Sequence, residues 1–158
     1  MIEPLRLSFE VACPADHAFR VWTARMGLWW PKGHTMTGGY DAEVVLEPHV
    51  GGRIFERAAD GTEHEWGEVT TYEPPERLAY LWHIRRPRQD ATDVEITFAD
   101  LDGGRCRVEI VHRGWERLGA DGATWRDANR GGWGGLLPHF TAACGGGTTM
   151  KEEAADGR

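Results

Sequence analysis

The sequence predicts an α+β domain in which an antiparallel sheet of six or seven strands carries its helices on one side. Short strand patterns follow one another through the middle of the chain without long helices between them. Turn-prone residues such as Asp60-Gly61 and the segment 101–105 separate these patterns. The only long apolar helical stripe lies near the end of the chain, where it can cover the sheet.

The length of 158 residues is enough for one domain with a single core. We place that domain at residues 1–144. The remaining segment, residues 145–158, is rich in glycine and polar residues, and we expect it to be disordered.

The N-terminal part predicts one strand followed by two short helices. Residues 5–11 alternate between apolar and polar side chains, which is typical of a half-buried strand. Pro14 suits the first turn of a helix. The apolar stripe of this helix consists of Ala15, Ala18, Phe19, Trp22 and Met26. Residues 27–31, bracketed by glycine and proline, predict a turn or second short helix that carries Trp29 and Trp30.

The central part predicts the remaining strands. They are expected at residues 44–46, 53–57, 63–72, 78–84, 94–98 and 108–112. Pro74 and Pro75 end the third of them, because proline cannot donate a hydrogen bond to a strand ladder. On a regular strand Glu63 and Glu65 share one face and Glu68 takes the other. This spacing favours a solvated edge over a carboxylate site.

A helix is expected from about residue 124 to residue 144. Its apolar face, within an arc of about 120°, consists of Trp125, Asn129, Trp133, Leu136, Leu137, Phe140 and Cys144. Four glycines between residues 131 and 135 oppose the helix by about 1 kcal/mol each, and Pro138 by about 3 kcal/mol. Two interpretations stay open. The glycines permit close packing on curved strands, or they form a hinge that lets the helix lift and admit a ligand.

Charge and cysteine content restrict the partners and the compartment. The 18 basic and 25 acidic residues give a net charge of −7, so we expect neither nucleic acid nor a membrane surface as a partner. Cys13, Cys106 and Cys144 are widely spaced and odd in number, which favours reduced, buried thiols. No signal-peptide pattern or membrane-span length is visible, and we expect a cytoplasmic protein.

Six sequence stretches in a fixed order carry a family resemblance. They are CPADHAFRVWTA, LWWP, EPHVGGRIFE, GEVTTYEPPERLAYLW, IVHRGW and GGWGGLLPHF. Together they resemble the START-like (SRPBCC) superfamily, and within it the family named for activators of the heat-shock-protein-90 ATPase. The resemblance covers residues 5–144 and implies a helix-grip fold, in which a curved sheet wraps around the last helix. Gly134, Gly135 and Pro138 depart from the family's usual helix.

This family resemblance implies a fold more firmly than an activity, because the superfamily includes small-molecule binders, aromatic polyketide cyclases and chaperone cofactors. We expect non-catalytic binding of a small hydrophobic or aromatic molecule between the sheet and the last helix. The alternatives are a chaperone ATPase cofactor and a cyclase- or dehydratase-like enzyme. A homodimer is a further possibility if Trp29 and Trp30 are exposed.

The candidate ligand-binding residues are mainly aromatic side chains from inward strand faces and from the last helix. They are Trp30, His34, Trp66, Tyr80, Trp82, Phe98, His112, Trp133 and Leu137. The alternative for these residues is a solid core. A dry cavity of about 300 Å³ would cost about 7 kcal/mol, so a pocket of that size should contain ligand, lipid or water, or be partly closed.

His112 shares a strand face with Val108 and Ile110, which directs its ring toward the buried side. It is either a hydrogen-bonded core histidine or a ligand partner with an acid/base role, which the enzyme alternative would combine with Tyr80. His34 is either an ordinary loop residue or part of a pocket mouth. Because HExxH, paired cysteines and GxSxG are absent, we expect no metal, no cofactor and no assembled nucleophile.

Overall fold

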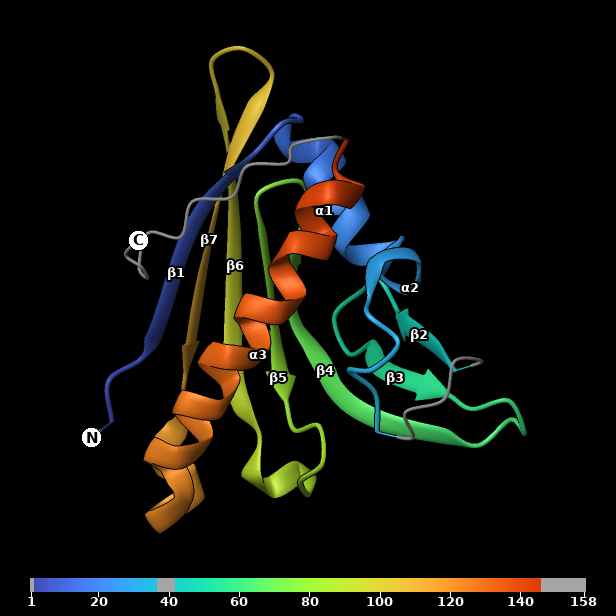
Figure 1. The fold of residues 1–158 in the computed structure, drawn as a ribbon, viewed down its shortest axis with the longest axis vertical. Helices are drawn as coiled ribbons and strands as arrows, with labels where there is room; N and C mark the ends of the chain where they lie inside the picture. The colour runs from blue at the N-terminus through green and yellow to red at the C-terminus, as the bar shows by residue number, and fades with distance from the viewer. Residues whose placement is uncertain (1, 37–41, 146–158) are drawn as a thin grey trace.

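The structure, a computed structural model, describes residues 2–36 and 42–145 (Figure 1). Its elements are β1 Leu5–Val11, α1 Ala15–Thr23, α2 Met26–Trp29, β2 Glu43–Leu46, β3 Arg53–Arg57, β4 Glu63–Glu73, β5 Arg77–Trp82, β6 Thr92–Leu101, β7 Arg105–Arg113 and α3 Gly122–Ala143. Two 3₁₀ helices, η1 Arg88–Asp90 and η2 Trp115–Asp121, precede β6 and α3. The segment predicted to be disordered lies, apart from residue 145, outside the described residues.

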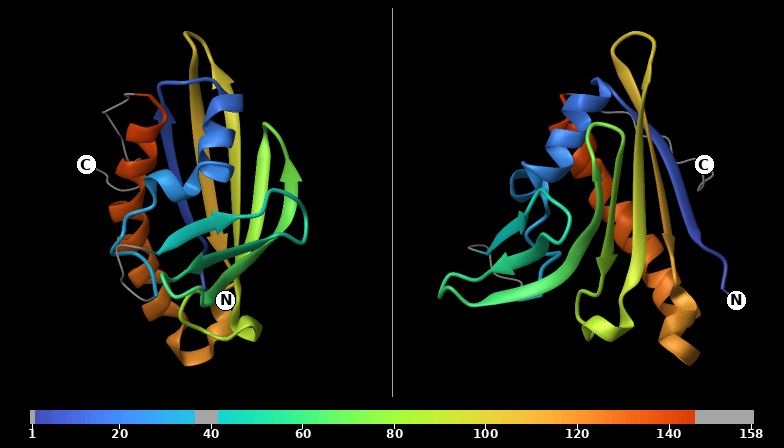
Figure 2. Two further views of the ribbon diagram at one scale, coloured as in Figure 1. Left: turned by 90° about the vertical axis from the view of Figure 1, so that its right-hand side faces the viewer. Right: turned by 180° about the vertical axis from the view of Figure 1, so that it is seen from behind.

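The seven strands form one antiparallel sheet in the order β1-β7-β6-β5-β4-β3-β2. The sheet is strongly curled, and α3 runs diagonally across its concave face, with α1 and α2 on the same side (Figures 1 and 2). The predicted α+β class and helix-grip architecture are confirmed. The first strand pairs with the last, from Leu5 opposite His112 to Val11 opposite Cys106.

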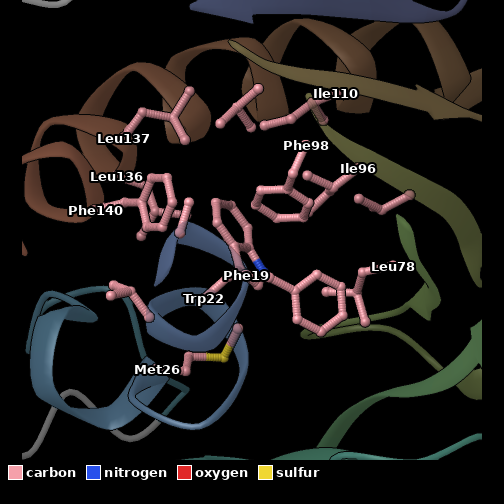
Figure 3. Packing of buried hydrophobic residues seen from close by; sticks show 14 of the residues in the cluster. Phe19, Trp22, Met26, Leu78, Ile96, Phe98, Ile110, Leu136, Leu137 and Phe140 are labelled. Atoms are coloured by element: carbon pink, nitrogen blue, oxygen red, sulfur yellow. The ribbon is translucent and has the colours of Figure 1, made fainter. Parts of the chain in front are cut away.

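The core lies between α1, α3 and the concave face of the sheet (Figure 3). Trp22 of α1 is fully buried at its centre, with its ring centroid 4.8 Å from that of Phe140 on α3. Phe19 packs edge-on against Phe98 of β6 at 5.3 Å. Since rings in such edge-on contacts contribute beyond their buried area, this aromatic cluster holds the two helices to the sheet.

The helix α3 forms in spite of its glycines because one face buries large apolar side chains. Trp133, Leu136, Leu137 and Phe140 are all buried on this face. A Cβ added at Gly131, Gly132 or Gly134 would meet no atom within 4 Å, and at Gly135 it would reach only the ring of His34, at 3.5 Å. The glycines therefore do not serve close packing against the strands, and that interpretation is wrong. The hinge interpretation stays a prediction.

A β-bulge in β4 changes the expected facing of its glutamates. Ile54 of β3 lies opposite Gly67, whereas Phe55 lies opposite Glu65, so the register shifts at Trp66. A side chain at Gly67 would clash with the carbonyl oxygen of Leu81 on β5. Beyond the bulge, Glu65 and Glu68 reach the same side of the strand, and Arg88 forms ion pairs with both. The expectation of opposite faces is wrong, because the extra residue resets the alternation.

Candidate ligand-binding site

A cavity of about 180 Å³ opens between the sheet and the middle of α3. It is lined by Trp30, Gly33 and His34 after α2, by Tyr80 and Trp82 of β5, by Ile84 and Arg85 after β5, and by Asn129, Gly132, Trp133 and Leu136 of α3. Three structural regions that are far apart in the sequence therefore contribute to one concave surface.

The wall formed by the sheet is a continuous aromatic surface. Trp82 lies with its ring centroid 5.8 Å from Tyr80 and 6.0 Å from Trp30. Trp66 lies behind Trp30 and Trp82. Its ring centroid is 5.1 Å from that of Trp30 and 5.7 Å from that of Trp82. Such interlocking of rings fixes the orientation of the side chains and leaves ring surface facing the cavity.

The structure brings five predicted site residues together at the cavity, namely Trp30, His34, Tyr80, Trp82 and Trp133. The other four are buried elsewhere in the core: Trp66 behind the aromatic wall, Phe98 against Phe19, Leu137 beside the core residue Phe140, and His112 behind Trp133. Strand and helix periodicity correctly indicates the inward direction of these side chains, but not which of them border free space.

Six residues that line the cavity were not among the predicted site residues: Gly33, Ile84, Arg85, Asn129, Gly132 and Leu136. Asn129 and Leu136 already belong to the predicted helical stripe, so the stripe itself was a signal for them. Ile84 continues the inward alternation of β5. No periodic signal marks Gly33 or Arg85, because both lie in loops.

The loop that carries His34 is fixed at several points. Trp30 donates its indole Nε1–H to the carbonyl oxygen of His34 at 2.9 Å. The buried carboxylate of Glu56 accepts hydrogen bonds from the backbone N–H of Met36 at 2.6 Å and from Trp66 Nε1 at 2.9 Å. Buried polar groups with such partners hold a specific geometry, so the mouth of the cavity is built on a defined loop.

His112 is closed off from the cavity by its own hydrogen bonds. Trp133 donates its indole N–H to His112 Nδ1 at 3.2 Å, and Nε2 lies 2.7 Å from Thr92 Oγ1. Because an indole N–H can only donate, Nδ1 is the acceptor and Nε2 carries the proton. Thr92 in turn donates to the carbonyl oxygen of Trp82 at 3.3 Å. A buried chain of hydrogen bonds thus connects two tryptophans of the cavity wall.

Burial also decides the protonation of this histidine. Desolvation lowers the pKa of His112 to about 3, so the ring is neutral at physiological pH. With both ring nitrogens engaged and no path to the cavity surface, His112 is a hydrogen-bonded core histidine that positions Trp133.

The side chain of Tyr80 lines the cavity, and its phenol stays neutral. Burial raises the pKa of its hydroxyl far above the ordinary value, and the nearby indole N–H of Trp22 offsets a smaller part of that shift. A phenol that does not ionise can still donate and accept hydrogen bonds. Tyr80 is nevertheless not suited to act as a base, and the indole N–H of Trp22 in the core lies near its hydroxyl.

The remaining polar groups of the cavity lie toward its mouth and on α3. Arg85 donates Nη2–H to the carbonyl oxygen of Thr35 at 2.7 Å. Asn129 donates Nδ2–H to the carbonyl oxygen of Trp125 at 2.9 Å, and its Oδ1 makes no hydrogen bond within the described residues. A few polar groups on a mainly aromatic wall are the usual composition of a small-molecule site.

Residues 2–36 and 42–145 contain no group of three histidine, cysteine or acidic side chains that could hold a metal ion. Among the helices of these residues, none has the length and apolar character needed to cross a membrane.

The family described as "Activator of Hsp90 ATPase homolog 1-like protein" matches residues 12–145. The chain belongs to this family. The match includes the whole cavity and nearly all of the described structure, and it confirms the resemblance seen in the sequence. Comparison of the sequence with curated proteins finds no match.

Solved structures with this fold include proteins named for different activities. An anthrahydroquino-gamma-pyrone synthase is 33% identical, with 90% of this chain and 97% of that chain covered and a TM-score of 0.64. The self-sacrificing resistance protein CalC from Micromonospora echinospora is 25% identical over 90% and 94% of the two chains, with a TM-score of 0.67. An HSP90 activator from Plasmodium falciparum is 16% identical over 95% and 100%, with a TM-score of 0.64, and shows the fold alone.

Proposed function

We propose that this protein binds a flat aromatic small molecule in the cavity between β5 and α3. The observation that carries the proposal is the wall formed by Trp30, Tyr80, Trp82 and Trp133. Indole and phenol rings offer apolar, polarisable surfaces that suit the faces of fused ring systems. His34, Arg85 and Asn129 supply the few polar groups that fix the orientation of such a ligand.

The size of the cavity restricts how the ligand is held. Typical small-molecule pockets measure about 300–1,000 Å³, whereas this one measures about 180 Å³ and is open to solvent on one side. The site therefore suits one end of a polycyclic molecule, with the other end projecting from the mouth, or a larger molecule admitted when α3 moves.

Of two relatives, one supports an aromatic ligand by its name. The relative with 33% identity is named for the synthesis of an anthrahydroquinone-pyrone, which is a fused aromatic ring system. The relative with 25% identity is named as a resistance protein. Both match about nine-tenths of this chain.

Binding can be tested by native mass spectrometry and thermal shift against a panel of anthraquinones, naphthoquinones and, for comparison, fatty acids. We expect the aromatic compounds to raise the melting temperature and the fatty acids to have little effect. If no compound of the panel binds or stabilises the protein, the proposal is wrong.

A matched pair of substitutions places the ligand in the cavity. Gly132 lines the cavity and Gly131 is exposed on the same helix turn, and an added Cβ meets no atom at either position. Gly132→Leu fills the cavity, and we expect it to weaken binding at least about tenfold. Gly131→Leu is the control with the same helix propensity and should bind as the original chain does.

A second candidate is ring closure on the bound molecule, and it is supported by the likeness to the synthase. The residues available for it are the neutral phenol of Tyr80 and the imidazole of His34, whereas His112 is hydrogen-bonded behind Trp133. Incubation with aromatic polyketide precursors, followed by chromatography, tests this candidate. Turnover that Tyr80→Phe abolishes would support it, and binding without any turnover would leave the protein as a non-catalytic binder.

A third candidate, a chaperone ATPase cofactor, rests on the family match and on a protein of the same fold that is named as an HSP90 activator. A pull-down with the chaperone and an ATPase assay test it, and a negative result in both would exclude it. Trp29 and Trp30 are buried, so they give no support to a homodimer. We also propose a cytoplasmic location, which the three free cysteines support.

A further inference from the structure

The loop between β5 and β6 carries three arginines with different partners. Arg86 pairs with Asp90 at 2.8 Å, and Arg88 pairs with Glu65 and Glu68. Arg85 makes no ion pair within residues 2–36 and 42–145. It is the one arginine of this loop that lines the cavity.

Arg85 is unusual in its backbone conformation as well as in its lack of an ion pair among the described residues. Its φ is 66°, a left-handed conformation that side-chain-bearing residues rarely adopt. Residues held in this region are concentrated at ligand-binding and catalytic sites. The following residue, Arg86, donates its backbone N–H to the carbonyl oxygen of His83 at 2.8 Å, which closes the turn.

One hydrogen bond fixes the guanidinium without neutralising it. Nη2 donates to the carbonyl oxygen of Thr35 at 2.7 Å, across the mouth of the cavity. A carbonyl oxygen carries no formal charge, and a guanidinium has five N–H donors. The positive charge and several donors thus stay available, and the side chain loses less conformational freedom when it binds a ligand.

The surroundings make this charge distinctive. Among residues 2–36 and 42–145, no aspartate or glutamate lines the cavity, although the whole chain carries a net charge of −7. The acidic residues near the loop are engaged with Arg86 and Arg88. An anionic group on a ligand would therefore meet a cation at the mouth of the cavity, with no carboxylate facing it from the described lining residues.

We propose that Arg85 selects aromatic ligands that carry an anionic oxygen group, such as a carboxylate or an ionised phenol, at the edge of the ring system. This inference rests on the proposed function and names the chemical class of its ligand. The rings lie against Trp82 and Trp133, and the anionic oxygens accept charge-assisted hydrogen bonds from the guanidinium.

Two probes with the same ring system test the inference: anthraquinone-2-carboxylate and anthraquinone-2-carboxamide. Affinities are measured from the quenching of tryptophan fluorescence at low and high salt. We expect the carboxylate to bind about tenfold more tightly than the amide, and this preference to decrease with salt.

Arg85→Gln should remove the preference, because it weakens binding of the carboxylate much more than binding of the amide. Arg88→Gln removes one charge from the same loop but outside the cavity, and should keep the preference. Circular dichroism spectra of both variants serve as the control for correct folding.

The outcomes separate the inference from the proposed function. If the original chain binds both probes equally, or if Arg85→Gln keeps the preference, the inference is wrong while the aromatic-binding function stands. If neither probe binds, the result contradicts the proposed function and the inference together.

Discussion

The indole Nε1 of Trp133 lies 3.2 Å from Nδ1 of His112, and this hydrogen bond fixes a cavity-lining ring of α3 to β7 of the sheet. The second ring nitrogen of His112 is engaged by Thr92, and the whole group is buried. The stability of the fold and the geometry of the cavity therefore depend on one neutral imidazole.

This arrangement predicts that the protein loses stability in mild acid. Burial lowers the pKa of His112 from 6.5 to about 3, so between these values the unfolded chain binds a proton that the folded chain does not. The free energy of unfolding then falls with decreasing pH, by about 2 kcal/mol from pH 7 to pH 5. Urea denaturation at the two pH values measures the change.

Two variants show whether His112 causes this loss. His112→Phe leaves the Trp133 N–H without its acceptor, and should cost about 1–3 kcal/mol at pH 7 and show a smaller decrease toward pH 5. His34→Ala, at an exposed loop position, should keep the full decrease. An unchanged pH dependence in His112→Phe would contradict the prediction.

The exposed glycines of α3 predict that alanine is stabilising there. A Cβ at Gly131 or Gly134 meets no atom within 4 Å, so Gly131→Ala and Gly134→Ala should each raise the free energy of unfolding by about 1 kcal/mol. Gly122→Ala, in the same helix, should destabilise, because the added Cβ would overlap with Ile2 and the Trp115 carbonyl. Thermal and urea denaturation measure all three, and destabilisation at Gly131 would contradict this account.

The hinge interpretation predicts uneven hydrogen exchange along α3. The backbone amides of residues 131–135 should exchange faster than those of β6 and β7, because the glycines weaken this part of the helix. Mass-spectrometric exchange on the native protein tests the expectation. Protection as strong as in the central strands would exclude the hinge, and a double variant with alanine at Gly131 and Gly134 should slow the exchange.

The three thiols should be unreactive in the folded protein. Cys13, Cys106 and Cys144 are buried, and burial raises the pKa of all three, that of Cys106 to about 12. A higher pKa means less thiolate at pH 8, and thiolate is the reactive form. Labelling with a chromogenic disulfide reagent should be slow in buffer and complete in denaturant. Fast labelling of Cys144 alone would indicate that the end of α3 opens.

Regular periodicity explains which parts of the fold were predictable from the sequence. The strand Leu5–Val11 has the predicted bounds, and α3 begins and ends within two residues of its predicted bounds. In both, a single face is buried, so local spacing carries the information. The bulge at Trp66 and the helix Trp115–Asp121 have no such period.

The cavity was predictable only in part. The aromatic residues of β5 and α3 were found because alternation and helical spacing direct them inward, whereas depth within the core decides that Phe98 and Leu137 do not border the cavity. Arg85 reaches the cavity because its own backbone is left-handed and because its side chain contacts Thr35, fifty positions away. Contacts of that kind depend on the completed tertiary structure.

The pairing of β1 with β7 has a consequence for biosynthesis. The strand that leaves the ribosome first finds its partner in the last strand made, and α3 emerges later still. Such a high contact order implies folding on a millisecond-to-second scale rather than the microsecond scale of helical domains. Until α3 has been synthesised, the tryptophan-rich side of the nascent sheet is without its cover and open to aggregation.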